Sequence, residues 1–293
     1  MEGGQTVAEW LHQFGRVVAE PWAETAWPEC VVLDSTEFQH RNPKTQKMGQ
    51  LFVVMAAWGY PAGNPKGRLW RLEARPTDRN SDWREFLDTL PGRPAGVVCD
   101  RDNAIIGGVR QRWGRGRNAV PIHLCEHHLW KKGMDALGRD GMRSYGTALP
   151  SLLRDAFRSP AGWDAFATAV AAEPLASKTQ RWVSHWDKRM RNQTARRASL
   201  PAHYSTGALE PKLHDVRDVL ERRKWTFRNR ARLNLLLELV RLRLNRHDDP
   251  TGWATLIRAH IDAHGGQSAH PRRMSDPVTI DPATGDRIYT LRG

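Results

Sequence analysis

The amino-acid sequence predicts a mixed α/β fold, in which a small sheet with packed helices precedes a long helical region. Three observations support this prediction. Five short runs rich in apolar and β-branched residues occur before residue 126, helical periodicity separates the last three of them, and helical patterns dominate after residue 126. Strands followed by a helix–strand alternation are typical of a mixed sheet covered by helices.

The first part of the chain predicts a helix followed by three strands. Apolar residues at helical spacing within residues 1–27 indicate an amphipathic helix that ends near Pro21 and Pro28. Turn-rich segments then separate three predicted strands, at residues 30–34, 51–58 and 68–74. We expect these strands to form a meander.

Helices and strands alternate next, and helices follow. The predicted elements are a helix, a strand, a helix and a strand, at residues 82–90, 95–100, 104–113 and 120–125. Several short helices are expected in residues 126–197, and strong periodicity of leucine and valine predicts a long helix in residues 211–246. Glu210 precedes Pro211, so we expect it at the very start of this helix. Residues 265–293 are polar and predict a loose tail, with a short strand near residues 288–291.

The charge of the chain is concentrated after residue 100. Lys and Arg outnumber Asp and Glu by 45 to 32 overall, which gives a net charge of +13. Residues 1–100 carry 11 basic and 13 acidic residues, whereas residues 101–293 carry 34 and 19. This imbalance favours a polyanionic partner for the second part of the chain, with a merely solubilising surface as the alternative.

Composition also excludes several classes of protein. The sequence has no apolar run of about 18 residues, so we expect no membrane span. The first residues lack the basic and apolar regions of a secretory signal. Three cysteines, at positions 30, 99 and 125, cannot form a disulfide framework. A cytoplasmic, nucleoid-associated location is therefore expected.

Two predicted strands each end in an aspartate. Asp34 follows the apolar run at residues 31–33, and Asp100 follows the run at residues 97–99. On adjacent strands these carboxylates would lie side by side and repel each other, and a divalent cation would remove the repulsion. Hard oxygen ligands suit Mg²⁺ or Mn²⁺. The alternative is that each aspartate is an ordinary turn residue.

The order of these motifs resembles the catalytic domain of the DDE-type transposases of bacterial insertion sequences, within the group that has a C-x-x-H element and a helical insertion. The segments VVLDSTEF, GVVCDRDNAIIGGVRQRWG, VPIHLCEHHLWKKG and STGALEPKLHDVRDVLERRKWTFRNRARLNLLLELVRLRLN carry the resemblance, which covers residues 30–246. No single motif is specific, but their order and spacing together are.

The resemblance implies a ribonuclease H-like core with an all-α insertion between the second and third acids. Asp34, Asp100 and Glu210 take the positions of the three acids, which are the catalytic residues and the ligands of Mg²⁺ or Mn²⁺. The implied activity is metal-dependent DNA strand cleavage and strand transfer. The implied partner is double-stranded DNA, as element ends and target, with self-association in the DNA complex.

The resemblance also divides the chain into parts. Residues 1–27 form an N-terminal helix, residues 28–128 and 205–246 the catalytic core, residues 129–204 the helical insertion, and residues 247–293 a C-terminal helix and loose tail. The gap of 110 residues between Asp100 and Glu210 requires such an insertion.

The insertion and the following helix carry the predicted DNA-binding residues. Basic side chains interleaved with tryptophan would grip phosphates and stack on an unpaired or flipped base; alternatively they form a solvated helix with tryptophan in its core. The residues are Lys178, Arg181, Trp182, Lys188, Arg189, Arg191, Arg196, Arg197, Arg222, Arg223 and Lys224, with Trp186 beside them.

The C-x-x-H element consists of Cys125 and His128. The resemblance implies that these residues support the active site; ordinary packing and a zinc site are the alternatives, although no second ligand pair is evident. Glu37 and Asp102 lie close to the leading acids in sequence and are ranked second as metal ligands.

Two further functions are consistent with the same residues. Only 33 residues precede Asp34, and they contain no cysteine pair, so we do not expect the N-terminal zinc ribbon or helix-turn-helix domain that such transposases usually carry. A truncated or domesticated DNA-binding relic without catalysis is therefore one alternative. A hydrolytic nuclease of the same fold, without strand joining, is the other.

Overall fold

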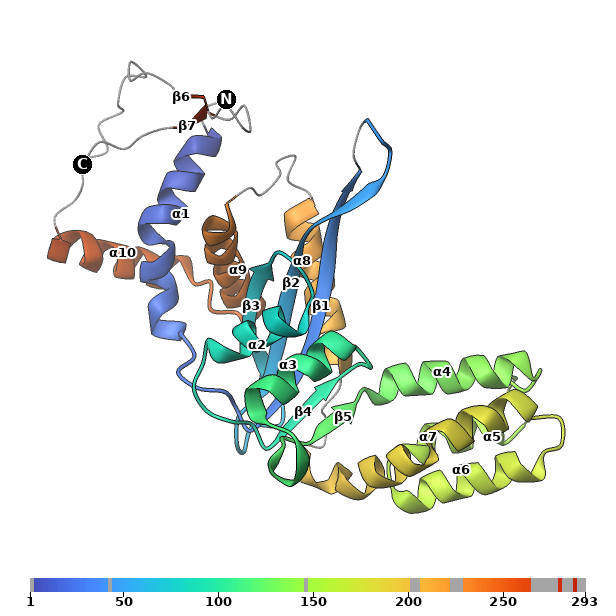
Figure 1. The fold of residues 1–293 in the computed structure, drawn as a ribbon. Helices are drawn as coiled ribbons and strands as arrows, with labels where there is room; N and C mark the ends of the chain where they lie inside the picture. The colour runs from blue at the N-terminus through green and yellow to red at the C-terminus, as the bar shows by residue number, and fades with distance from the viewer. Residues whose placement is uncertain are drawn as a thin grey trace. The chain divides into compact units, whose positions relative to one another are not determined.

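A computed structural model describes residues 3–41, 44–144, 147–200, 206–221, 229–264, 279–280 and 287–288 (Figure 1). The chain divides into two units, Met1–Pro250 and Thr251–Gly293. The first unit contains the sheet, the helices packed on it and every candidate site residue that the structure describes.

Five strands form one mixed sheet in the order β3-β2-β1-β4-β5. The strands β1 (Cys30–Arg41), β2 (Met48–Tyr60) and β3 (Arg68–Arg75) are antiparallel neighbours. The strands β4 (Gly96–Cys99) and β5 (Ile122–Leu124) continue the sheet in the direction of β1. The predicted mixed α/β class is confirmed, and the elements follow one another along the chain as expected.

The β1–β2 hairpin is longer than the sequence pattern predicts. The antiparallel pairing extends from Cys30 opposite Tyr60 to Arg41 opposite Met48, with a bulge at Phe38 and Gln39. Past the ends of β3 and β4, no strand among the described residues pairs with this ribbon, so its residues are mixed and do not form an apolar run. Phe38 and Phe52 stack across it with ring centroids 4.7 Å apart.

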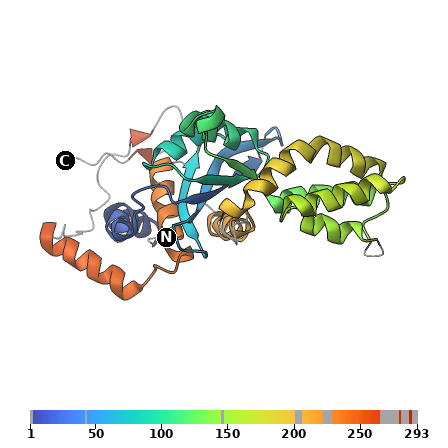
Figure 2. The same cartoon turned by 90° about the horizontal axis from the view of Figure 1, so that it is seen from below.

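Helices cover both faces of the sheet (Figures 1 and 2). The helices α2 (Asn80–Asp88) and α3 (Asn103–Trp113) pack on one face. The helices α1 (Gly3–Ala19), α8 (Glu210–Glu221) and α9 (Arg230–Leu244) pack on the other. Figure 2 shows the sheet between these two layers.

Alternation along the strands divides the core between the two layers. Val31 and Leu33 are buried against α2 and α3, whereas Cys30 and Val32 are buried against α8 and α9. Successive strand residues point to opposite faces, so burial on both sides explains why the run at residues 30–33 is apolar throughout.

The predicted long helix in residues 211–246 is instead two helices, α8 and α9. Asn229 is the N-cap of α9, and its side-chain oxygen accepts a hydrogen bond from the Arg232 backbone N–H at 3.0 Å. Asparagine favours such a cap because its side chain satisfies an otherwise unpaired backbone donor. Leucine and valine recur at helical spacing both in α8 and in α9, so the sequence pattern does not show that one helix ends and another begins.

Four helices form the insertion between β5 and α8: α4 (Glu126–Arg139), α5 (Leu149–Ala156), α6 (Pro160–Ala172) and α7 (Ser177–Arg196). Their buried aromatic side chains continue the core that lies under α2 and α3. Gln193 of α7 attaches the insertion to the sheet: its side-chain amide donates to the Leu124 carbonyl at 2.8 Å and accepts from the Leu124 N–H at 3.0 Å. This side chain thus provides hydrogen-bond partners for two backbone groups of β5, which is an edge strand.

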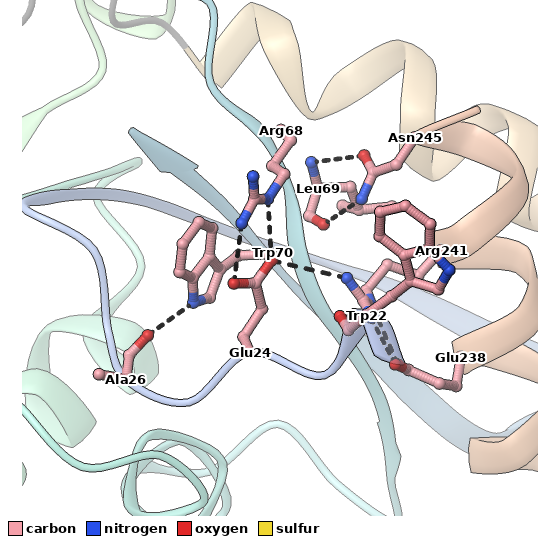
Figure 3. A network of polar contacts seen from close by, with 9 residues as sticks. All are labelled: Trp22, Glu24, Ala26, Arg68, Leu69, Trp70, Glu238, Arg241 and Asn245. Carbon is pink, nitrogen blue, oxygen red and sulfur yellow. Dashed lines mark hydrogen bonds and ion pairs between the residues drawn. The ribbon is translucent and has the colours of Figure 1, made fainter. Parts of the chain in front are cut away.

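A polar network joins the segment before β1 to β3 and α9 (Figure 3). Arg241 is 2% exposed; it contacts Glu238 at 2.6 Å, lies 3.8 Å from Glu24, and donates to the Trp22 carbonyl at 2.8 Å. Glu24 also accepts two hydrogen bonds from Arg68, at 2.8 and 3.0 Å. Two carboxylates therefore compensate the buried guanidinium of Arg241.

Side-chain amide and indole groups complete this network. The Asn245 side chain donates to the Leu69 carbonyl at 2.8 Å and accepts from the Leu69 N–H at 3.0 Å, so it pairs with the outer edge of β3. The Trp70 indole donates to the Ala26 carbonyl at 3.0 Å. The network fixes α9, and the layer to which α8 belongs, on the sheet.

The second unit contains α10 (Pro250–His264) and a small antiparallel pair, β6 (Thr279–Ile280) with β7 (Arg287–Ile288). The strand expected near residues 288–291 corresponds to β7, and the other residues of the expected loose tail lie outside the described residues.

Replacing Arg241 with alanine should lower the free energy of unfolding by about 3 kcal/mol, because Glu24 and Glu238 would lose their buried partner. Urea denaturation followed by circular dichroism measures the change. Arg243→Ala, at an exposed position of the same helix, is the control and should change stability by less than about 0.5 kcal/mol. Equal effects of the two variants would contradict the role given to the network.

Candidate active site

Asp34 and Asp100 lie next to each other on neighbouring parallel strands. Leu33 pairs in register with Cys99, and each aspartate is the next residue of its chain segment. Neighbouring strands are about 4.8 Å apart, so the two carboxylates project from adjacent positions. Asp100 follows the end of β4 as expected. The expectation that Asp34 ends its strand is wrong, because pairing with β2 continues β1 to Arg41.

Both aspartates face the layer that contains α8. Val32 and Val98 are buried in the core formed with α8 and α9. Asp34 and Asp100 are two residues further along the same strand directions, and side chains two residues apart share a face. Two independent strands therefore direct their carboxylates to one side of the sheet.

Glu210 begins the helix that covers this side. It is the first residue of α8, as predicted from the proline that follows it. Its carboxylate lies 3.8 Å from the Nε2 atom of His128. His128 occupies the first turn of α4, and Cys125 is the N-cap of that helix, with its N–H donating to the Cys99 carbonyl at 2.7 Å. The C-x-x-H element thus lies between the end of β4 and Glu210.

The electrostatics of Asp34 link all of these groups. Burial, together with the negative charges of Asp100 and Glu210, raises the pKa of Asp34 to about 6; the Ser35 N–H, which donates to the carboxylate at 2.8 Å, and His128 oppose the rise. The neighbouring Cys125 side chain and the carboxylates of Asp100 and Asp34 raise the pKa of His128 against its burial. Five predicted site residues therefore share one neighbourhood.

The acids ranked second have other positions. Asp102 caps α3 by accepting from the Ala104 N–H at 2.5 Å, while its own N–H donates to Asp100 at 2.8 Å. Glu37 is exposed and lies three residues beyond Asp34, on the opposite face of β1. Asp102 therefore orients Asp100, and Glu37 is not brought to the face of the three acids.

Sequence analysis missed Asp78. Its carboxylate accepts a hydrogen bond from the Ser35 hydroxyl at 3.0 Å and another from the Trp83 indole. Burial raises the pKa of Asp78, although both hydrogen bonds lower it. Asp78 thereby fixes the residue whose N–H binds Asp34. Its segment between β3 and α2 has turn composition, and nothing in it distinguishes this aspartate from an ordinary turn residue.

The chemistry of the three carboxylates fits a hard divalent cation, because they are oxygen ligands whose mutual repulsion such an ion would remove. As the side chains are placed, no group of three His, Cys, Asp or Glu among the described residues is close enough to hold a metal ion. Metal binding would therefore require rotation of these side chains. Glu210 can rotate because it is the first residue of α8.

The predicted DNA-binding residues of α7 fall into two groups. Arg191 forms ion pairs with Asp187 and Asp164, and Arg197 donates to Glu126 at 2.9 Å, so carboxylates already occupy these two guanidinium groups. The others that the structure describes are exposed cations or a half-buried tryptophan: Lys178, Arg181, Lys188, Arg189, Arg196 and Trp182. Arg222, Arg223 and Lys224 lie outside the described residues.

The tryptophans of α7 pack in the core of the insertion. Trp186 is 4% exposed, and the Arg101 guanidinium lies 5.1 Å from the centre of its ring. Trp182 is half-buried, with its ring centroid 5.9 Å from that of Trp163 and 6.3 Å from that of Phe166. Of the two interpretations, these contacts favour tryptophan as core over free stacking platforms.

No protein-family model matches the sequence, and no curated protein matches it significantly. Among the helices that the structure describes, none is both long and apolar enough to cross a membrane.

Asp34→Asn should stabilise the protein at pH 7.5, measured by urea denaturation in EDTA. A carboxyl whose pKa is raised in the folded state lowers the free energy of unfolding above pH 6, where it is ionised. This loss of stability disappears below about pH 4, where the carboxyl is protonated in both the folded and the unfolded state. The shift to about 6 corresponds to at most about 3 kcal/mol.

The stability difference between Asp34→Asn and the wild type should therefore vanish as the pH falls from 7.5 to 4. Asp215→Asn, at an exposed position of α8, should show no such difference at either pH. A wild type as stable as Asp34→Asn at pH 7.5 would contradict the electrostatic account of the site.

Proposed function

We propose that the chain is the catalytic part of a DDE-type insertion-sequence transposase, a metal-dependent enzyme that cuts and joins DNA strands. One observation carries the proposal: carboxylates from two adjacent parallel strands and from the start of α8 converge on one face of the sheet, and those of Asp100 and Glu210 raise the pKa of Asp34. Perturbed acids in such a cluster are typical of functional sites.

The arrangement of the chain supports a ribonuclease H-like core. Three antiparallel strands, a helix, a parallel strand, a helix and a second parallel strand follow one another, and four helices separate β5 from α8. This is the element order and the insertion that the resemblance implies for this group of transposases.

In this proposal Asp34, Asp100 and Glu210 hold Mg²⁺ or Mn²⁺, which when bound would activate the attacking oxygen and stabilise the leaving oxygen of a phosphodiester. The protein supplies the orientation. Asp102 holds Asp100 through a hydrogen bond, and His128 holds Glu210 from α4. Cys125 and His128 act as supporting residues and not as metal ligands.

The surroundings of the acids suit a polyanionic substrate. Arg101 directly follows Asp100 and lines a pocket of about 450 Å³ with residues of α4 and α7, which are Lys132, Asp135, Ala136, Arg139, Lys178, Trp182 and Trp186. Its four cations outnumber its single carboxylate and would attract DNA phosphates, with an affinity that falls steeply as salt rises. Double-stranded DNA is therefore the proposed partner, bound by more than one copy of the chain.

The proposal predicts Mn²⁺-dependent nicking of supercoiled plasmid at low salt, and at least a hundredfold slower nicking by Asp100→Asn and by Glu210→Gln. Several kcal/mol of transition-state stabilisation would be lost with either carboxylate, and each 1.4 kcal/mol is tenfold in rate. Glu221→Gln, at the other end of α8, is the matched control and should nick as the wild type does.

The products separate the proposal from its alternatives. Joined strands support a transposase, whereas cutting without joining at any DNA end indicates a hydrolytic nuclease. A wild type that binds plasmid without nicking it would indicate a catalytically inactive DNA-binding relic. Undiminished nicking by Asp100→Asn would overturn the assignment of the acids.

A further inference from the structure

A second basic pocket lies further along α7, toward the C-terminal end of that helix and against the edge strand of the sheet. Its volume is about 350 Å³. β5 contributes Ile122 and His123, and α7 contributes the rest of the lining, which consists of His185, Lys188, Arg189, Asn192, Gln193 and Arg196. None of these residues belongs to the three acids or to the C-x-x-H element.

The geometry of α7 produces this lining. His185, Lys188, Asn192 and Arg196 follow one another at spacings of three or four residues, so they share one face of the helix. Gln193 holds that part of α7 against β5 through its two hydrogen bonds to Leu124. The pocket is therefore built on two rigid elements that are fixed to each other.

The charge of the pocket is entirely positive. Lys188, Arg189 and Arg196 contribute cations, and no carboxylate is among the lining residues. In the described part of the chain, neither Lys188 nor Arg189 forms a salt bridge, in contrast to Arg191 and Arg197 on the same helix. Cations gathered without carboxylates favour an anionic ligand.

The neighbours of Arg189 strengthen this conclusion. Burial lowers the pKa of Arg189, and the nearby charges of Arg101 and Arg110 lower it further against the effect of Cys99. Arg101 directly follows Asp100, so the positive region extends from the pocket toward the candidate acids.

The uncharged residues of the pocket leave its charge positive. Burial, and then the charges of Arg196 and Arg197, lower the pKa of His123 to about 4, so its imidazole is neutral at pH 7. Asn192 adds an exposed side-chain amide. No tryptophan, tyrosine or phenylalanine lines the pocket, so the lining suits phosphate oxygens and not the stacking of bases.

We propose that this pocket binds a backbone phosphate of DNA and anchors the duplex apart from the site of cleavage. The inference rests on the proposed function, since it assumes that DNA is the substrate. It adds a contact that recognises phosphate independently of the base sequence and leads, through Arg189 and Arg101, to Asp100.

The test measures DNA affinity against salt concentration for the full chain in EDTA, so that no DNA is cut. Two 30-base-pair duplexes of unrelated sequence serve as probes. Lys188→Ala/Arg189→Ala removes two exposed cations. Asn192→Asp adds a carboxylate to the pocket and removes no cation. Arg154→Ala/Arg158→Ala, which removes two exposed arginines in α5 and just after it, is the α5 control with the same change of charge.

Loss of one phosphate contact should make the slope of log K against log salt shallower by about 0.9 for both pocket variants and both duplexes. The α5 control should keep the slope of the wild type. Circular dichroism and the melting temperature establish that each variant is folded; if the double variant does not fold, Asn192→Asp decides the test.

Several results would overturn the inference. An unchanged slope in Asn192→Asp, or an equal change in the α5 control, would overturn phosphate binding in this pocket. The proposed cleavage function would not be affected by either result. A loss confined to one duplex would indicate base recognition in place of phosphate binding. A wild type that nicks plasmid but binds duplexes with no salt dependence would also exclude the phosphate site, whereas absence of all DNA binding would overturn both proposals.

Discussion

The parallel pairing of β1 with β4 is the contact on which the candidate site depends. It places Asp34 and Asp100 at neighbouring positions on one face of the sheet, where burial and like charge raise the pKa of Asp34 to about 6. A partly buried carboxylate beside like charges costs the fold stability. The cost in free energy of ionising Asp34 is the physical reason to look for a ligand or a reaction there.

The rest of the molecule brings compensating groups to this pair. The network around Arg241 fixes α9 and its layer, and α8 in that layer begins with Glu210. The insertion begins beside Cys125 and His128 and ends with α7, whose cations line two pockets. One of these pockets includes Arg101, the residue after Asp100. In the proposed function, the acids would bind a divalent cation and the basic residues would bind the phosphates of DNA.

Sequence analysis was most successful where periodicity is strong. It located the five strands, the helices between them and the start of α8 at Glu210, because burial on two faces and a proline at the first turn leave local signals. It could not anticipate contacts between distant segments. The pairing of Arg191 with Asp164, the burial of Trp186 and the hydrogen bonds of Asp78 depend on tertiary packing, and the extension of β1 depends on its partner β2.

The central claim is that Asp34, Asp100 and Glu210 form one divalent-cation site, and a crystal structure of the protein grown with Mn²⁺ tests it most directly. We expect an anomalous difference peak between the carboxylates of Asp34 and Asp100, with Glu210 rotated from His128 toward the ion. No peak at these residues in crystals saturated with Mn²⁺, or a peak at another cluster, would contradict the account.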